Sequence, residues 1–193
     1  MTHQPMGFAL IGTVWAWAAA ELVPQARQRL RSGRTERTER RSLLVIWVLF
    51  WGGAAAAVLT RHAVAALSYP AHGRVLGGVV PALAWAGIAL RLWSIVALGR
   101  FFRATVHIQR GHRLVSSGPY RWVRHPSYSG LLPALLSFAA LLGNALSWLV
   151  FTVCALAAVA YRIRVEERML LDALGEEYRA YAARTPRLIP GVW

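Results

Sequence analysis

The feature that most constrains this chain is a run of 36 residues, Pro126–Tyr161, without a single charged side chain. As one straight helix the run would measure about 54 Å, because an α-helix rises about 1.5 Å per residue, whereas the hydrocarbon core of a bilayer is about 30 Å thick. The run must therefore fold back on itself. Its only strong turn signal is Gly143-Asn144, which predicts a tight helical hairpin with arms Ser127–Leu142 and Ala145–Tyr161.

Three other long apolar runs precede this one. They cover Phe8–Ala20, reaching Val23 past Glu21, then Ser42–Thr60, and finally Val75–Leu90, which continues past Arg91 to Gly99. These runs predict three membrane spans, and together with the two hairpin arms they make five. The sequence thus predicts an all-α integral membrane protein with five transmembrane helices.

The arginines give this topology an orientation. Seven lie in 24–41, six in 100–124 and six from residue 162 to the end, whereas the opposite side holds only Arg61 and Arg74. Basic residues are retained in the cytoplasm. Nineteen against two therefore predicts an N-terminus outside, a C-terminus in the cytoplasm and an odd number of spans, which supports the hairpin independently.

The segment after the last span has a different pattern. In Arg162–Ala183 apolar residues recur three or four positions apart with charges between them, which predicts an amphipathic helix under the cytoplasmic face, with a possible break at Gly175. We expect one membrane domain over residues 1–193. Three N-terminal spans occupy 1–99, and a cofactor-binding loop, the hairpin and the C-terminal helix occupy 100–193.

Composition excludes several classes of function. The net charge of +14 comes from arginines placed between apolar blocks, which argues against a nucleic-acid-binding face. Cys154 is the only cysteine, so it can form neither an intramolecular disulfide nor a cysteine metal site, and packing is its expected role. His107, His112 and His125 have no carboxylate or thiol at metal-ligand spacing, so no metal is expected.

Polar residues concentrate instead in Arg100–Tyr128, in Arg162–Glu167 and at Arg91, all on the predicted cytoplasmic side. A closed hairpin would bring His125 next to Arg162. Guanidinium groups suit a carboxylate or phosphate, paired glutamates suit hydroxyl or ammonium groups, and tyrosine faces suit adenine or a cation. S-adenosylmethionine carries groups that would use all of these.

Two motifs in this region also carry a family resemblance. They are RHPxY (Arg124–Tyr128) and RxxxEExxL (Arg162, Glu166, Glu167 and Leu170), together with the "GHRLV" turn. At this separation they resemble the isoprenylcysteine carboxyl methyltransferase family, a group related to phospholipid methyltransferases, over about residues 91–193. The resemblance implies an S-adenosylmethionine-dependent enzyme that methylates a carboxylate on a lipophilic or prenylated acceptor arriving from the bilayer.

The resemblance also implies roles for individual residues. Arg91 and Arg162 would face the methyl acceptor from opposite walls. The residues implied to contact the cofactor are Gln109, His112, Arg113, Leu114, Val115, Tyr120, His125, Pro126, Ser127, Tyr128 and Glu166.

Other interpretations of the same residues stay open. Arg91 could snorkel to the membrane surface, and Glu166 and Glu167 could pair with Arg162 or Arg164 along a helix. A phospholipid amine N-methyltransferase, an NADPH-dependent membrane reductase of similar build and a non-catalytic membrane scaffold are the alternative functions. Tyr178 and Tyr181 are expected to pack rather than to bind the cofactor.

Overall fold

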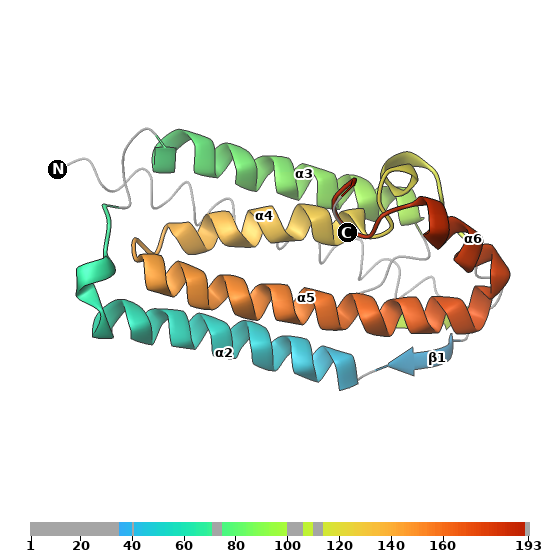
Figure 1. Cartoon of the computed structure of the whole chain (residues 1–193), viewed down its shortest axis with the longest axis horizontal. Coiled ribbons are helices and arrows are strands. Elements are labelled where there is room, and N and C mark those ends of the chain that lie inside the picture. The colour runs from blue at the N-terminus through green and yellow to red at the C-terminus, as the bar shows by residue number, and fades with distance from the viewer. Residues whose placement is uncertain (1–34, 40, 71–74, 100–105, 110–113, 192–193) are drawn as a thin grey trace.

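A computed structural model describes residues 35–39, 41–70, 75–99, 106–109 and 114–191. In these ranges the fold is mostly helical, and its long helices lie side by side in a row (Figure 1). α3 packs against α4, α4 against α5, and α5 against α2. The bounds of these helices are Arg41–Ala63 for α2, Val80–Leu98 for α3, Pro126–Ala140 for α4 and Ala145–Leu174 for α5.

The long uncharged run is interrupted between α4 and α5, at residues 141–144. Gly143 has a φ of 71°, in the left-handed region that favours glycine. The Asn144 side chain then accepts a hydrogen bond from the Ser147 backbone N–H at 3.0 Å, which caps the first turn of α5. Gly143 and Asn144 therefore supply the conformation and the cap that separate the two helices.

Three helical segments in the described ranges are long and apolar enough to cross a membrane. They are Leu44–Ala63, Leu76–Leu98 and Ala145–Leu174. α4 has 15 residues and measures about 22 Å, less than the hydrocarbon core. The first predicted span, Phe8–Ala20, lies outside the described residues, so the count of five stays a prediction.

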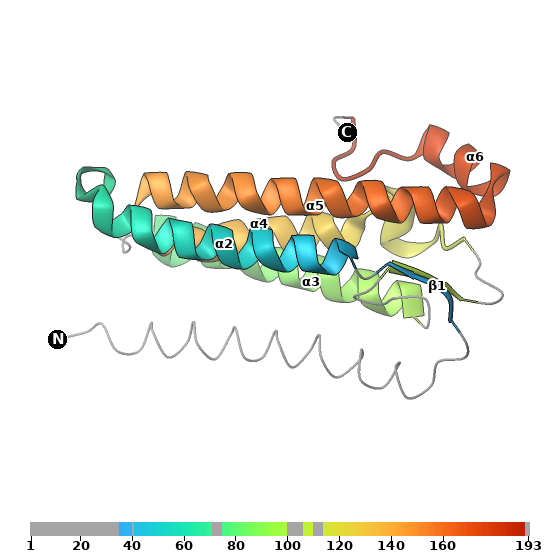
Figure 2. The same cartoon turned by 90° about the horizontal axis from the view of Figure 1, so that it is seen from below.

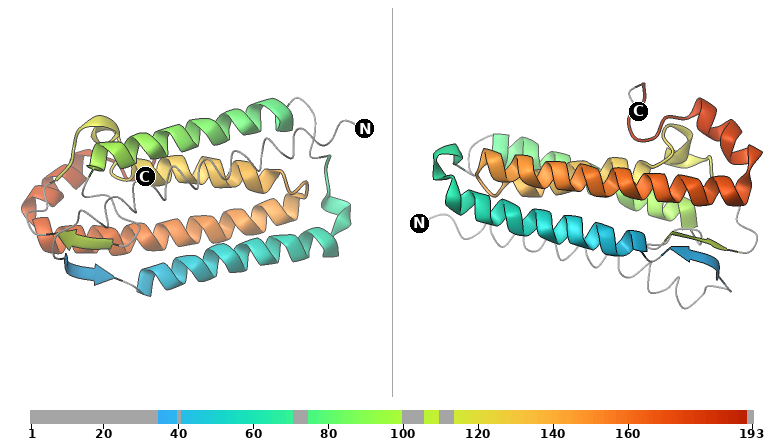
Figure 3. Two further views of the ribbon diagram at one scale, coloured as in Figure 1. Left: turned by 180° about the vertical axis from the view of Figure 1, so that it is seen from behind. Right: turned by 60° about the horizontal axis from the view of Figure 1, so that its bottom comes forward.

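The all-α prediction misses a small antiparallel sheet. Strand β1, Thr35–Glu39, pairs with strand β2, Val106–Gln109, with Glu39 opposite Val106 and Thr35 opposite Gln109. Thr, Val and Ile favour strands because their branched side chains fit a pleated surface. The sheet lies beyond the N-terminal end of α2, near the C-terminal half of α5 (Figures 1 and 3).

The prediction of a separate amphipathic helix over Arg162–Ala183 is wrong in its start. α5 continues unbroken from the apolar run to Leu174, because neither Gly nor Pro occurs in Ala145–Leu174 and Arg, Glu and Leu are good helix formers. Gly175, with a φ of 52°, ends it, and the short helix α6 covers Glu176–Arg184. The charged motif after Tyr161 therefore has a fixed rotational phase relative to the apolar part of α5.

Glycines set the closest helix contacts. A side-chain carbon added at Gly130 of α4 would lie 2.7 Å from the Arg91 backbone nitrogen in α3, so these helices approach as closely as backbones allow. In the same way, a carbon at Gly53 of α2 would lie 2.6 Å from Cβ of Cys154 in α5. Cys154 thus has the packing role expected for it, and Gly130 brings Arg91 against the start of α4.

Candidate active site

The RHPxY motif forms the entry to α4, at the end of the row away from the Leu141–Asn144 turn. Pro126 occupies the first helical position, where its missing N–H costs nothing because that group would have no partner within the helix. Pro126 is fully buried, and His125, the residue before it, is 4% exposed. The motif is therefore a packed part of the fold and not a surface loop.

Arg91 reaches this motif from α3. Its Nη1 donates to the Ser127 hydroxyl at 2.9 Å and, more weakly, to the Ser127 carbonyl at 3.4 Å. Arg91 is half-buried, so it does not extend to solvent as a snorkelling side chain would. A guanidinium oriented by Ser127 is thus held where α3 meets α4.

Tyr128, Arg162 and Glu166 form a second polar group beside the first. The Tyr128 hydroxyl donates to Oε2 of Glu166 at 3.1 Å and accepts from Nε of Arg162 at 3.4 Å. Arg162 and Glu166 are four residues apart on α5, hence on one face of that helix, and Arg162 is only 3% exposed. The structure therefore brings a cation, an anion and a phenol from both motifs together.

Tyr120 joins these residues from the short 3-10 helix Gly118–Arg121. Its hydroxyl donates to the Ser94 carbonyl at 3.4 Å, and its own carbonyl accepts from the Tyr181 hydroxyl at 2.6 Å. Burial, followed by the nearby negative charge of Glu166, raises the pKa of Tyr120, and burial raises the pKa of Tyr181 to about 12. Both phenols stay protonated at neutral pH and act as hydrogen-bond donors.

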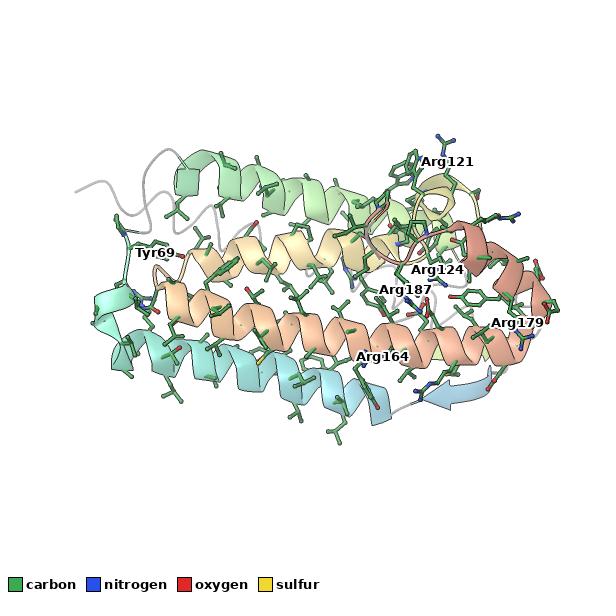
Figure 4. All side chains as sticks on the ribbon, viewed as in Figure 1. Tyr69, Arg121, Arg124, Arg164, Arg179 and Arg187 are labelled. Atoms are coloured by element: carbon green, nitrogen blue, oxygen red, sulfur yellow. The ribbon has the colours of Figure 1, made fainter. Side chains whose placement is uncertain are left out.

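A third cluster, around Glu167, was not anticipated from the sequence. Glu167 is 8% exposed and accepts two hydrogen bonds from Nε of Arg187, at 3.0 and 3.1 Å. Nη1 of Arg124 lies 3.2 Å from the same carboxylate, and Nε2 of His125 lies 3.3 Å from it. Figure 4 shows Arg124 and Arg187 converging between α5 and the C-terminal segment.

This cluster changes the interpretation of the glutamate pair. The expectation that Glu167 could pair along the helix with Arg162 or Arg164 is wrong, because its partners come from the RHPxY motif and the C-terminal segment. Successive helical residues point about 100° apart, so Glu166 and Glu167 face different neighbours. The sequence alone would have predicted these different directions if α5 had been expected to continue past Tyr161.

The remaining residues that the sequence analysis selected are less defined. Leu114 and Val115 are half-buried, and Gln109 is the last residue of β2, which lies against α5. His112 and Arg113 lie outside the described residues. Across the described ranges, no three His, Cys, Asp or Glu side chains are grouped so that they could hold a metal ion.

An apolar groove of about 800 Å³ adjoins this end of the molecule. α3 contributes Val80 and Leu83, and α4 contributes a face that extends from Ser129 to Ala140. α5 contributes residues between Trp148 and Ala160, and the C-terminal segment contributes Leu188 and Ile189. Ser129 follows Tyr128 directly, so the groove begins next to the polar groups.

Known proteins resemble the part of the chain that carries these residues. Residues 80–172 match the isoprenylcysteine carboxyl methyltransferase family. The chain is 38% identical over 108 residues to protein-S-isoprenylcysteine O-methyltransferase B of Arabidopsis thaliana, covering 55% of each protein. It is 37% identical over 106 residues to protein-S-isoprenylcysteine O-methyltransferase of Schizosaccharomyces pombe, covering 54% of this chain and 45% of that protein.

The match to these curated relatives therefore spans about half of their length. A solved structure of the eukaryotic intramembrane Ras methyltransferase ICMT resembles the whole fold more broadly. It superposes with a TM-score of 0.69 at 23% identity, over 99% of this chain and 70% of that one. The two chains thus share a fold, and three described segments of this chain are long and apolar enough to cross a membrane.

Proposed function

We propose that the chain is a member of the isoprenylcysteine carboxyl methyltransferase family, whose model matches residues 80–172, and that it transfers a methyl group from S-adenosylmethionine to a carboxylate on a lipophilic acceptor. The observation that carries this proposal is the meeting of Arg91, Ser127, Tyr128, Arg162 and Glu166 next to an apolar groove. A water-soluble cofactor and a membrane-borne acceptor can reach such a boundary from different phases.

The side chains at this boundary fit the proposed cofactor. Glu166 offers a carboxylate for hydroxyl or ammonium groups, and Tyr120 and Tyr128 offer aromatic surfaces and protonated hydroxyls. We assign cofactor contacts to the set expected from the family, which is Gln109, His112, Arg113, Leu114, Val115, Tyr120, His125, Pro126, Ser127, Tyr128 and Glu166. When bound, the cofactor supplies an electrophilic methyl group on a positively charged sulfur.

The acceptor's hydrocarbon chain fits the apolar groove. The groove follows α4 from Ser129 to Ala140, a distance of about 16 Å, and begins one residue after Tyr128. An acceptor lying in it would place its polar head next to Arg91 and Arg162. The groove therefore supports a partner with a long apolar tail and an acidic head, such as a prenylated cysteine.

Methyl transfer from a sulfonium to this head requires no general base. A carboxylate is already ionised at neutral pH, so the protein would have no proton to remove before the bound cofactor supplied its methyl group to the carboxylate oxygen and kept the carbon–sulfur electron pair on sulfur. The products are a methyl ester and a neutral thioether, and no proton moves. Arg91 and Arg162 hold the carboxylate in line with the methyl group, and the buried surroundings exclude water.

We propose the membrane arrangement that the arginine distribution predicts. The chain has five spans, with α4 and α5 as the last two, its N-terminus outside and its C-terminus in the cytoplasm. The nineteen arginines on one side support this orientation. The site then lies at the cytoplasmic face, where S-adenosylmethionine is available.

Cofactor binding tests the proposal directly. Titration of the purified full chain with S-adenosylhomocysteine should give saturable heat, and Glu166→Ala should weaken the affinity about tenfold because a charged hydrogen-bond partner is lost. Glu177→Ala removes an exposed carboxylate of α6 and is the matched control, expected to leave the affinity unchanged. Unchanged affinity in Glu166→Ala would remove Glu166 from the cofactor site.

The acceptor class needs a second experiment. Transfer of a labelled methyl group to membrane extract should give a lipophilic product whose label is released by mild base, as for a methyl ester. A base-stable product would indicate an amine acceptor and hence the N-methyltransferase alternative. A melting temperature raised by NADPH and not by S-adenosylhomocysteine would indicate the reductase alternative.

A further inference from the structure

The segment Thr185–Ile189, which we call the C-terminal strap, is joined to the start of α4. The Arg124 N–H donates to the Pro186 carbonyl at 2.8 Å, and the His125 N–H donates to the Arg187 carbonyl at 2.9 Å. The Ser129 hydroxyl donates to the Leu188 carbonyl at 2.7 Å. After α6 has ended, the strap thus lies along the first two residues of the RHPxY motif and reaches Ser129 in the first turns of α4.

Glu167 fixes the strap through side chains as well. Its carboxylate receives Arg187 of the strap together with Arg124 and His125, the two residues whose backbones hold the strap. The carboxylate is largely buried and has three cationic or hydrogen-bonding partners, so its removal would strongly destabilise this contact. Glu167 therefore holds the strap in place together with these backbone and hydroxyl hydrogen bonds.

The other side of the strap faces the apolar groove. Leu188 and Ile189 line the groove at the end where Ser129 lies, and Leu188 is packed into the hydrophobic core. Leu188 follows Arg187 and its carbonyl accepts from Ser129, so the strap lies at the end of the groove that begins next to Tyr128. Figure 2 shows the C-terminal segment turning back from α6 toward the body of the row.

We infer that the strap selects the acceptor, because Leu188 and Ile189 set the shape of the first part of the hydrocarbon chain that follows the polar head. The inference rests on the proposed function. Deeper in the groove, the acceptor's hydrocarbon chain leaves contacts with bilayer lipid for contacts with apolar side chains. Because both surroundings are apolar, burial there gains little free energy. At the strap the wall is fixed by Glu167, and shape can discriminate between a chain that is branched near the head and a linear one.

The test compares two acceptors on the full chain in lipid nanodiscs. They are cysteine thioether acids of equal carbon number, one with a branched isoprenoid chain and one with a linear alkyl chain. Ile189→Trp should narrow the groove and lower kcat/KM for the branched acceptor about tenfold more than for the linear one. Leu149→Ala, on an exposed part of α5 outside the groove, is the control and should not change the ratio.

Glu167→Gln tests the position of the strap without changing the groove wall itself. It keeps the side-chain size but weakens the hold on Arg187, so the ratio of kcat/KM values for the two acceptors should fall toward one. An unchanged ratio in both Ile189→Trp and Glu167→Gln would overturn the inference, and bilayer lipid would then be the groove's occupant. Wild-type protein that binds no S-adenosylhomocysteine would instead overturn the proposed function.

Discussion

The two ends of the helical row are both rich in polar groups, but these groups are of different kinds. At the turn end, formed by Val64–Tyr69 and residues 140–147, every polar side chain that we describe is neutral. Asn144 donates to the Val64 carbonyl at 2.8 Å, Ser147 donates to the Ala57 carbonyl at 2.6 Å, and Tyr69 donates to the Ala140 carbonyl at 2.7 Å. Each group has a close partner, so this end is a closed joint between α2 and the α4–α5 turn.

The charged end, defined by Arg91, Arg124–Tyr128, Arg162–Glu167 and Arg187, contains several cations and two carboxylates. One carboxylate, Glu167, serves Arg124, His125 and Arg187. Within the described ranges the buried hydroxyl of Tyr178 and the buried Nε of Arg124 have no hydrogen-bond partner. Figure 4 shows the contrast, with Tyr69 at one end and the labelled Arg124 and Arg187 toward the other.

The difference indicates a division of labour along the row. A joint made of neutral, paired groups stabilises the fold and has nothing left to offer a ligand. An end with excess cations and unpaired polar atoms is stable only if a few ion pairs hold it, and it can bind an anionic partner. Substitutions at the turn end should therefore change only the free energy of unfolding, whereas substitutions at the charged end should also change turnover or binding.

The largest effect should come from Glu167→Ala at the charged end. Removing this carboxylate takes the anion away from the largely buried Arg124 and from the partly exposed Arg187, which should lower the free energy of unfolding by about 3 kcal/mol. Denaturant titration in mixed micelles measures the loss. Glu177→Ala is the control, and an equally small loss in both variants would mean that the charged end does not depend on Glu167.

Arg91→Ala should be nearly as severe, but for turnover and not for stability. Loss of the guanidinium next to Ser127 should lower kcat about hundredfold because the acceptor carboxylate loses one of its two positioning groups. S-adenosylhomocysteine affinity, measured by calorimetry, should change less than about twofold. An equal loss of cofactor affinity would place Arg91 on the cofactor side. Arg164→Ala, an exposed arginine of α5, is the control.

These two residues also differ in how far the sequence could reveal them. Arg91 was selected because an ionisable residue inside an apolar run is unusual, and that signal is local. Glu167 was treated as an alternative surface pair because its role depends on its direction around α5. That direction follows only if the helix continues through Tyr161, whereas the change from apolar to amphipathic pattern suggested a new helix there.

Contacts between segments far apart in the sequence could not be predicted elsewhere in the chain either. The turn at Gly143-Asn144 could be predicted from these two residues alone. Glycine adopts the positive φ through its own backbone, and asparagine caps the next helix with its own side chain. Strand β1 pairs with β2 about 70 residues away, and the strap pairs with α4 about 60 residues away. Neither segment carries an alternation long enough to predict its partner, so the sheet and the strap appear only in the structure.

Asn144→Ala should sharpen the contrast from the turn end. It removes the cap on Ser147 and the hydrogen bond to the part-buried Val64 carbonyl, which should lower the free energy of unfolding by about 2 kcal/mol. Asn144→Asp keeps the acceptor for Ser147 and should recover part of this loss. Cofactor affinity and kcat of the folded fraction should match the wild type, and a change in either would break the proposed division of labour.

Tyr69→Phe should give the smallest effect and the cleanest comparison. The substitution removes only the hydroxyl that donates to the Ala140 carbonyl, where α4 ends, and should lower the free energy of unfolding by about 1 kcal/mol. Tyr161→Phe removes a hydroxyl from an exposed position of α5 and is the matched control, expected to be neutral. If Tyr69→Phe changed kcat as well, the neutral joint would be coupled through α4 to Ser127 and Tyr128, and the two ends would form one functional unit. Unchanged kcat with reduced stability would keep them separate, because α4 would then transmit no strain from its last turn to its first.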